Sequence, residues 1–462
     1  MIYETEEALL YKAKEAEGKT FGDIDQTGRI ENERAKGHLG QIIEESLFGY
    51  EINSKSEADF SNLEIELKVT PIKRIKNGSL SAKERLVLNI INYQEESLKT
   101  FESSSFWSKN KNLLIMFYEW MPELKRADYQ VIKSFIHKFD EEDLEIIKQD
   151  WNYIVGEIKK GLAHELSEAD TIYLGACTKG VNRDSLRSQP YSTIPAMQRA
   201  YSLKQSYMTS LVRQKITNEH LVSIASKQEL RKTSLEELLH NRFSPYIGMT
   251  LEKIALKFNI EVNYKSKSFL QEFVSSMLGI KSTSLSNIEE FSKANIHFKT
   301  IRLEKNGIPK EHMSFKKINF HEWKESTWEE SWPSNYFEET KFLLVVFEYK
   351  ETERQNSNRQ LFFKGIKLWN MPVKTIEGPL KAFWIDVQQL LNEGVTLVEK
   401  QRGTSTVVAN NLPAPRSNGI CHIRPKAKDG KDKVQLPDGQ WITKQAFWLD
   451  REYIAKVLSD LD

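Results

Sequence analysis

Residues 59–68 read DFSNLEIELK, and this stretch predicts both a strand of a central sheet and the start of a chemical site. Its apolar residues from Leu63 to Val69 occupy every second position, which is the period of a half-buried strand. Glu66 and Lys68 then point to the same side, because successive side chains of a strand alternate between the two faces. Asp59 lies seven residues before Glu66, where a preceding turn can fold it back against that side.

Two carboxylates that converge beside an ammonium favour a hard cation such as Mg²⁺, which takes one or two protein carboxylates and completes its shell with water and phosphate oxygens. The cation stabilises charge that develops on phosphorus, while Lys68 holds or helps to deprotonate the attacking water. Asp59, Glu66 and Lys68 thus match the D…ExK pattern of metal-dependent DNA nucleases. The chain is 28% charged, so the pattern taken alone also fits a solvated strand face.

The setting of this stretch carries a resemblance to a known family. GHLGQIIE at 37–44 precedes it, KVTPI at 68–72 continues it, and SKN at 108–110 leads into the apolar run LLIMF at 113–117. In these motifs the chain resembles the MutH family of DNA nucleases. Further stretches are similar to the two-domain, GATC-cutting type II restriction endonucleases of staphylococci rather than to the mismatch-repair nickases: LSAKERLVLNIINY at 80–93, HELSE at 164–168 and CTKG at 177–180. The resemblance extends over nearly the whole chain.

Size and composition bound the class of protein. A chain of 462 residues can form two or more domains, and its formal net charge of +1 does not by itself indicate a nucleic-acid binder. Its two cysteines, Cys177 and Cys421, are far apart, which excludes a zinc ribbon or a disulfide scaffold and fits a reducing cytoplasm. The apolar runs are too short to span a bilayer, and the first residues do not resemble a signal peptide. We therefore expect a soluble cytoplasmic protein.

Motifs of the first half return in the same order in the second half, which indicates an internal duplication. The paired stretches are GQIIE 40–44 and GMTLE 248–252; DFSNLEIELK 59–68 and EFSKANIHFK 290–299; LLIMF 113–117 and LLVVF 343–347; Trp151 with Gly161 and Trp384 with Gly394; CTK 177–179 and RPK 424–426; KQSY 204–207 and KQAF 444–447.

The second copy differs where the chemistry needs it most. Glu290 replaces Asp59, His297 replaces Glu66, and Glu339 replaces Lys109. A histidine beside a displaced carboxylate is a poor Mg²⁺ site, because Mg²⁺ demands oxygen ligands in near-octahedral geometry. The second half is therefore interpreted as a DNA-binding fold without an active site, in which His297 is structural.

The predicted fold class is α/β, with two tandem restriction-endonuclease-like (MutH-like) domains that each have a central mixed sheet of about five strands flanked by helices. The expected division is a catalytic domain at 1–213, a linker at 214–232 and a catalytically degenerate DNA-binding or effector domain at 233–462. The linker is polar and lacks alternation, and TSLE at 233–236 resembles a capping box that opens the next helix.

Candidate DNA contacts follow the catalytic motifs in each half. The run from Lys179 to Lys215 holds seven basic residues and one acidic residue, with tyrosines between them, and an ordinary solvated basic face is the alternative. In MutH-like enzymes the equivalent loop enters the major groove, and Lys179 matches a DNA-contacting lysine. The predicted contacts are Lys179, Arg183, Arg199 and Lys204 in the first half, and Arg424, Lys426 and Lys444 in the second. An arginine at such a loop can pair with guanine, a contact worth about 1–3 kcal/mol of discrimination.

The resemblance adds two catalytic candidates. It places Glu44, on a predicted amphipathic helix, near the metal, and Lys109 in reach of a phosphate. It further implies Mg²⁺-dependent double-strand cleavage of DNA at GATC, before the G, with 5′-phosphate ends. A second DNA site would bind to the C-terminal half as an allosteric effector, and the protein would be a monomer that dimerises or loops DNA. A cognate methyltransferase is expected in the same restriction-modification system. The alternatives are a mismatch-repair-type GATC nickase and a non-catalytic sequence-specific DNA-binding protein.

Overall fold

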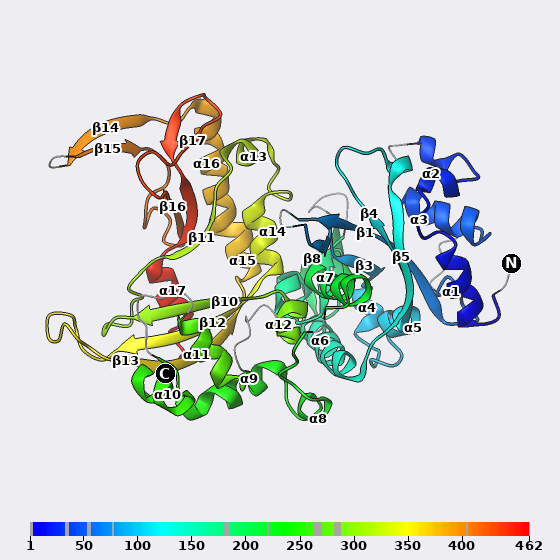
Figure 1. Ribbon diagram of the computed structural model, residues 1–462, viewed down its shortest axis with the longest axis horizontal. Coiled ribbons are helices and arrows are strands. Elements are labelled where there is room, and N and C mark those ends of the chain that lie inside the picture. The colour runs from blue at the N-terminus through cyan, green and yellow to red at the C-terminus, as the bar shows by residue number, and fades with distance from the viewer. Residues whose placement is uncertain are drawn as a thin grey trace. The chain divides into compact units, whose positions relative to one another are not determined.

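The computed structural model describes residues 3–32, 37–52, 57–75, 78–179, 185–219, 221–261, 269–280, 288–402 and 405–461. Contacts divide the chain into two compact units (Figure 1). The first unit comprises Met1–Leu238 and Ser284–Ile296, and the second comprises Leu239–Thr283 and His297–Asp462. Within the described ranges, no helix combines the length and the apolar character needed to cross a membrane.

The first unit is built on two separate sheets rather than on one sheet of about five strands. A four-stranded mixed sheet has the order β2-β1-β4-β5, in which β1 and β4 are parallel and the other neighbours antiparallel. A three-stranded antiparallel sheet has the order β3-β9-β6, and β7 and β8 form a hairpin. The strands are β1 (Ile65–Arg74), β2 (Leu80–Ala82), β3 (Leu86–Ile90), β4 (Asn112–Glu119), β5 (Gln130–Lys138), β6 (Leu174–Thr178), β7 (Leu186–Gln189), β8 (Ser192–Met197) and β9 (Arg199–Leu203).

The helices of the first unit surround these sheets. They are α1 (Glu6–Lys14), α2 (Phe21–Ile24), α3 (His38–Ile42), α4 (Tyr93–Glu96), α5 (Ser105–Asn110), α6 (Glu141–Lys159), α7 (Gln205–Val212), α8 (Lys227–Leu230) and α12 (Glu289–Ala294).

Strand β1 is more deeply buried than its alternating sequence indicates. It begins at Ile65, and Glu64 before it closes a turn in the left-handed region at φ 56°. Ile65 and Leu67 pack into a core with α1, α2 and α3. The opposite face is not solvated, because Glu66 is only 4% exposed. The prediction of a half-buried strand is wrong for this part, since β1 lies inside the sheet between β2 and β4 and is covered on both faces.

The second unit repeats the arrangement. Its sheets have the orders β10-β12-β13 and β11-β19-β16, with the two-stranded pairs β14-β15 and β17-β18. In Figure 1 the β14-β15 ribbon extends beyond the other strands of this unit. The strands are β10 (Ile296–Leu303), β11 (Met313–Lys317), β12 (Lys341–Tyr349), β13 (Leu361–Trp369), β14 (Leu397–Arg402), β15 (Ser405–Asn410), β16 (Cys421–Pro425), β17 (Lys433–Gln435), β18 (Trp441–Thr443) and β19 (Gln445–Leu449).

A core rich in aromatic side chains holds the second unit together. Phe342, Leu344 and Val346 of β12 pack against Trp384 of α16 and Phe447 of β19. The remaining helices are α9 (Leu235–Phe243), which begins in the first unit, and α10 (Leu251–Phe258), α11 (Phe269–Met277), α13 (Phe320–Glu325), α14 (Trp332–Glu339), α15 (Val373–Thr375), α16 (Lys381–Glu393) and α17 (Arg451–Val457).

Strand register shows the duplication residue by residue. Leu86 and Leu174 both pair with Leu203 in the first unit, and Met313 and Cys421 both pair with Leu449 in the second. Helices α6 and α16 are equivalent as well, and the glycines that follow them, Gly161 and Gly394, both have positive φ. The echoes in the sequence therefore correspond to a repeated fold.

The stretch predicted as a linker, 214–232, is counted with the first unit and is partly helical. It contains the end of a π-helical turn, Arg213–Thr217, and α8, which Ser226 and Glu229 cap reciprocally. The Gln149 side chain of α6 donates to the Leu230 carbonyl at 2.8 Å. This segment is thus held against the first unit by its own contacts.

Candidate active site

Asp59, Glu66 and Lys68 come together at the start of β1. The Asp59 carboxylate accepts a hydrogen bond from the Leu67 N–H at 2.9 Å, and the Asp59 N–H donates to Glu66 Oε2 at 3.3 Å. Lys68 Nζ donates to Glu66 Oε1 at 2.8 Å. The turn closed by Glu64 therefore folds the seven-residue spacing back on itself, as the sequence predicts.

Lys109 reaches the same carboxylate from α5. Its Nζ lies 3.6 Å from Glu66 Oε1, and its side chain is 18% exposed. Ser104 caps the start of this helix, because its hydroxyl accepts the Trp107 N–H. The helix ends just before β4, the parallel neighbour of β1. This connection sets α5 beside β1 and brings the lysine to the site.

Glu44 approaches from the π-helical turn Ile43–Leu47 that continues α3. Burial raises the pKa of Glu44 to about 7, and the charges of Asp59 and Glu66 act in the same direction. Burial and the charge of Glu66 likewise raise the pKa of Asp59 to about 6. Three carboxylates thus crowd into a partly desolvated space that two ammonium groups do not fully compensate.

This donor set fits a hard divalent cation. The carboxylates of Asp59, Glu66 and Glu44 provide oxygen ligands, which Mg²⁺ and similar cations prefer over nitrogen or sulfur. The raised pKa values of two of them mark a surplus of negative charge that a dication relieves. The described residues around this cluster therefore suit metal-assisted chemistry on an anionic substrate.

The predicted DNA contacts of the first unit separate into three groups. Lys179 is exposed at the end of β6, where its N–H donates to the Gln198 carbonyl at 2.8 Å. Arg183 lies outside the described residues. Arg199 and Lys204 are buried, so their prediction as DNA contacts is wrong. Arg199 begins the central strand β9 and donates to the Ala176 carbonyl at 2.6 Å, and Lys204 donates to the Thr171 carbonyl at 2.6 Å.

In the second unit, Arg424 and Lys426 are exposed near the end of β16. Both lie over the Trp448 ring, at 5.7 and 5.8 Å from its centre. Lys426 Nζ also donates to the Phe315 carbonyl at 2.8 Å. Trp448 was not predicted from the sequence, because the cross-strand contact that places it under these cations becomes visible only with the register of β16 and β19.

The position of Lys444 shows that one of the matches between the two halves of the sequence is wrong. The Lys426 N–H donates to the Lys444 carbonyl, as the Lys179 N–H donates to the Gln198 carbonyl. Lys444 is therefore equivalent to Gln198, and the predicted match to Lys204 is wrong. Its half-exposed side chain pairs with Asp432.

The equivalents of the catalytic residues have structural partners in the second copy. The Glu290 carboxylate accepts hydrogen bonds from the Ser223 hydroxyl and from the N–H groups of Ile224 and Ala225. His297 Nδ1 lies 2.7 Å from the Tyr336 hydroxyl, and burial lowers the pKa of His297 to about 4. Lys299, equivalent to Lys68, donates to the Ser314 carbonyl at 3.0 Å.

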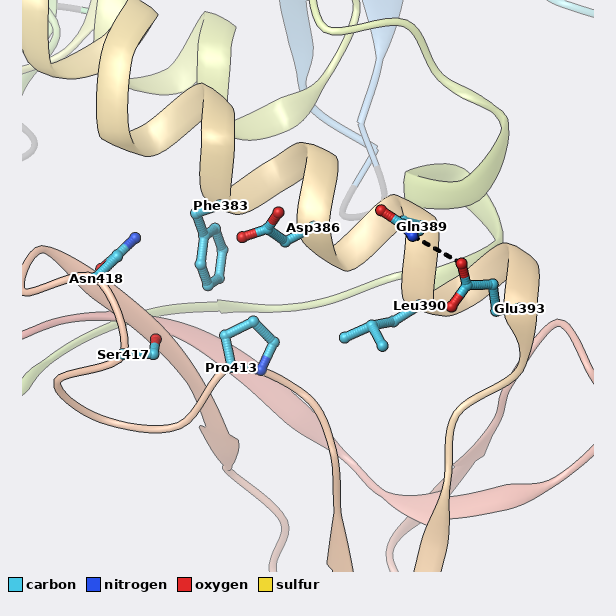
Figure 2. A pocket seen from close by; sticks show the side chains of 8 residues that line it. All are labelled: Phe383, Asp386, Gln389, Leu390, Glu393, Pro413, Ser417 and Asn418. Carbon is cyan, nitrogen blue, oxygen red and sulfur yellow. Dashed lines mark hydrogen bonds between the residues drawn. The ribbon is translucent and has the colours of Figure 1, made fainter.

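A pocket of about 380 Å³ in the second unit lies between α16 and the segment around 413–418 (Figure 2). Asp386 and Glu393 line it, and among the described residues that line it there is no lysine or arginine. Its charge therefore does not suit phosphate groups, and it is separate in kind from the site on β1.

Comparison with known proteins finds relatives both of the whole chain and of parts of it. The type II restriction enzyme Sau3AI of Staphylococcus aureus is 36% identical, over 99% of each chain. DNA mismatch repair protein MutH of Escherichia coli is 26% identical and that of Shigella flexneri 27%, over 45% of this chain and 92% of theirs. The family described as DNA mismatch repair enzyme MutH matches residues 48–150 and 278–378. The starts of these two segments, at 48 and 278, are offset by the same number of residues as Leu113 and Leu343 in the duplicated strands.

Proposed function

Because the chain belongs to the MutH family of DNA nucleases, we propose that it is a type II restriction endonuclease that cuts double-stranded DNA at GATC. The cut falls before the G on each strand and leaves 5′-phosphate ends, with Mg²⁺ as the cofactor. The observation that carries the proposal is the convergence of Asp59, Glu66 and Lys68 on β1 with Lys109 and Glu44. The target rests on the similarity to Sau3AI over both whole chains.

The carboxylates of Asp59 and Glu66, with Glu44 nearby, would hold the cation. When bound, Mg²⁺ supplies Lewis-acid stabilisation of the charge that develops on the phosphate. Lys68 positions the attacking water, since its ammonium is held beside the carboxylates by the hydrogen bond that it donates to Glu66 Oε1. Lys109 neutralises charge on the scissile phosphate, because it reaches the cluster from α5, 3.6 Å from Glu66 Oε1.

The exposed end of β6 is the DNA-reading part of the first unit in this proposal. Lys179 is exposed there, and its backbone is fixed to β9 through Gln198. Arg199 and Lys204 contribute to this surface only indirectly, by holding carbonyl groups of the strands and turns beneath it. One phosphate or base-edge contact from Lys179 adds to affinity and to its dependence on salt.

The second unit acts as an allosteric effector that binds a second copy of the site. The support is that it keeps the fold and carries exposed cations in the stretch equivalent to 177–179, with Lys426 at the position of Lys179 and Arg424 at that of Cys177. In the second copy of the motif, Glu290 and His297, the equivalents of the catalytic carboxylates, hold structural hydrogen bonds. The protein is a monomer that dimerises or loops DNA on binding. It works in the cytoplasm, beside a methyltransferase that protects the host's own sites.

Plasmid cleavage tests the proposal against its two alternatives. The purified chain is incubated with a plasmid that carries GATC sites and with a matched plasmid that lacks them, with and without Mg²⁺. Linear fragments that require both the sites and Mg²⁺, with ends that begin at GATC and carry 5′-phosphates, support the proposal. Nicked circles alone would favour a mismatch-repair-type nickase, and a gel shift without cleavage would favour a non-catalytic DNA-binding protein.

A further inference from the structure

The small sheet β11-β19-β16 of the second unit has one apolar and one polar face. Cys421 and Ile423 of β16 and Leu449 of β19 point into the core. His422 pairs across the strands with Trp448, so these two side chains share the opposite face. Their rings are parallel within 10°, with centres 6.4 Å apart. The polar face therefore connects His422 to the tryptophan that lies under Arg424 and Lys426.

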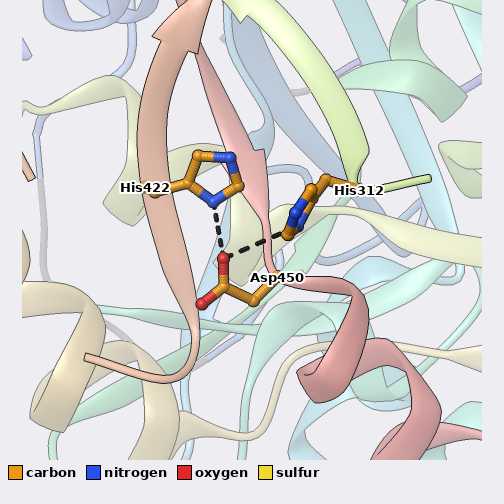
Figure 3. A group of neighbouring side chains, drawn as sticks. All are labelled: His312, His422 and Asp450. Atoms are coloured by element: carbon orange, nitrogen blue, oxygen red, sulfur yellow. Dashed lines mark hydrogen bonds and ion pairs between the residues drawn. The ribbon is translucent and has the colours of Figure 1, made fainter. Parts of the chain in front are cut away.

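Three potential metal ligands converge at one end of this face (Figure 3). Asp450 Oδ1 lies 2.5 Å from His422 Nδ1 and 3.7 Å from His312 Nδ1. One ligand atom from each of the three residues lies within 4.8 Å of the other two. His422 and Asp450 are completely buried, and His312 has 14% of its side chain exposed. The three residues come from β16, the start of α17 and the residue before β11, so the cluster joins three elements.

The equivalent place in the first unit is occupied by cations. Strand register makes Arg85 the counterpart of His312, Gly175 of His422 and Lys204 of Asp450. Arg85 pairs with Glu168, which packs over Gly175 so closely that a Cβ there would lie 2.6 Å from Glu168 Cγ. Lys204 is buried as well, and it donates to the Thr171 carbonyl.

The second unit has thus exchanged both cationic side chains for an imidazole and a carboxylate. Arg416 and Arg451 do not replace them, because their guanidinium groups pair with Glu452 at 2.7 and 3.3 Å. Asp450 Oδ2 accepts a hydrogen bond from the backbone N–H of Arg416 at 3.1 Å, and this donor carries no charge. Within the described part of the chain, His422 Nε2 is buried without a hydrogen-bond partner. A buried carboxylate between two imidazoles calls for a compensating cation.

We propose that His312, His422 and Asp450 bind a divalent transition-metal ion of the Zn²⁺ class. Two imidazole nitrogens and one carboxylate oxygen suit Zn²⁺, whereas Mg²⁺ prefers an all-oxygen shell. The ion takes the place of the proton between His422 and Asp450, and at His312 it replaces the hydrogen bond that the Arg451 N–H donates to Nδ1 at 3.1 Å. It ties β11, β16 and α17 together below Trp448, and so fixes the base of the surface that carries Arg424.

Metal analysis of the untagged full chain tests this site. The protein is stripped with a chelator, mixed with Zn²⁺, desalted and assayed for bound zinc, and Co²⁺ is added to a second sample to read the ligand field from visible absorption. We expect one tightly held Zn²⁺ per chain in the wild type and in an Asp59→Ala, Glu66→Ala double variant, which lacks the carboxylate site on β1. His312→Ala is expected to weaken binding by about 100-fold or more, because a direct ligand matters at least as much as the outer groups around a metal.

Two controls keep the result decisive. His321→Ala removes an exposed histidine on α13 of the same unit and should leave zinc binding unchanged. His422→Ala risks misfolding because the side chain is buried, so the partly exposed His312 carries the test, and melting of the metal-free proteins confirms that each variant is folded. Zn²⁺ should raise the melting temperature of the wild type but not of His312→Ala. Retention of no zinc by the wild type, or equal retention by folded His312→Ala, would overturn the proposal.

Discussion

Lys68 Nζ and Glu66 Oε1 lie 2.8 Å apart on one face of β1, and Lys109 reaches the same oxygen from α5 at 3.6 Å. The other oxygen, Glu66 Oε2, accepts the Asp59 N–H. Three groups of this chain therefore hold the Glu66 carboxylate in place. Such support before substrate arrives is what a catalytic site requires, because the reacting groups then pay little to reach the productive geometry.

Replacing Glu66 with alanine is expected to lower the single-turnover cleavage rate by at least about 10²–10³-fold, because it removes a cation ligand and the group that orients Lys68. DNA affinity, measured by gel shift in Ca²⁺ or chelator, should stay near that of the wild type, since the substitution leaves the exposed Lys179 at the end of β6 unchanged. Asp59→Ala should behave in the same way.

Glu64→Ala is the matched control for that pair. Glu64 lies two residues away in the turn, 61% of its side chain is exposed, and it pairs with Lys111. Its removal should leave the cleavage rate within a few-fold of the wild type. An equal loss from Glu64→Ala would mean that the cation is held on the other side of the turn.

The stability of the Glu44→Gln variant, compared with that of the wild type at several pH values, should reveal the repulsion between carboxylates in the metal-free site. The folded pKa of Glu44, about 7, lies above its ordinary value of 4.5, so the folded state binds this proton more tightly than the unfolded state does. The wild type therefore loses stability as pH rises through about 7. Glutamine stays neutral, so the advantage of Glu44→Gln over the wild type should grow by about 1–2 kcal/mol between pH 5 and pH 8, after allowance for partial exposure.

Urea unfolding in chelator at several pH values measures this difference, and Glu45→Gln provides a control of opposite sign. Glu45 pairs with Arg29, which lowers the pKa of Glu45, so its carboxylate stabilises the fold at neutral pH. Glu45→Gln should therefore be less stable than the wild type at pH 8. A pH-independent difference between Glu44→Gln and the wild type would contradict the electrostatic account of the site.

The sequence predicts the catalytic cluster better than the DNA contacts. The physical reason is that the cluster depends on residues close together in the sequence, whereas the exposure of the cations depends on contacts between distant segments. Asp59, Glu66 and Lys68 are connected by one turn and one strand, so their meeting follows from short-range geometry. Arg199 and Lys204 looked like surface cations because a run of charges does not reveal which side chains face inward. Their burial is decided by the pairing of β9 with two neighbours and by carbonyl groups from distant segments.

Lys444 and Lys204 illustrate a second limit. Both precede a glutamine and an aromatic residue lies three positions on, yet one stretch continues as a strand and the other as a helix. The similarity of a few residues cannot distinguish these outcomes, because tertiary contacts override local preference in short segments. The backbone hydrogen bonds show which residues are equivalent: Lys444 accepts from Lys426 as Gln198 accepts from Lys179, so Lys444 occupies the position of Gln198 in the repeat.

Glu290→Ala is expected to destabilise the protein by about 2–4 kcal/mol, although this residue matches a catalytic aspartate. Its buried carboxylate satisfies the Ser223 hydroxyl and two backbone N–H groups, and all three would be left without that acceptor. Denaturant unfolding measures the loss, and Glu236→Ala, an exposed change on α9, should cost less than about 0.5 kcal/mol. The cleavage rate per folded molecule should be unchanged; a thousandfold drop would mean that the second copy takes part in chemistry.

The last prediction concerns what a second copy without the catalytic carboxylate pair contributes. A palindromic site presents two scissile phosphates related by a two-fold axis, while the described residues of each chain bring together one cluster of the kind found at the start of β1. If the second unit binds another copy of the site, it raises the local concentration of target at the first unit and can favour the state that cuts. A plasmid with two GATC sites should then be cut faster than a plasmid with one, and a short duplex that carries the site should stimulate cleavage of the one-site plasmid.

Arg424 is the residue on which this stimulation should depend most. Its guanidinium lies over Trp448 in an exposed position, whereas the Lys426 ammonium donates to Ser314 and Phe315 of its own sheet. Arg424→Ala should therefore abolish the stimulation while basal cleavage of the one-site plasmid continues, and Lys426→Ala should reduce it less. Lys305→Ala, a change at an exposed lysine in the turn after β10, serves as the control for loss of one surface charge. Equal rates on one-site and two-site plasmids, unaffected by Arg424→Ala, would leave the second unit with a structural or dimerising role, because an effector must bind one state of the enzyme better than the other.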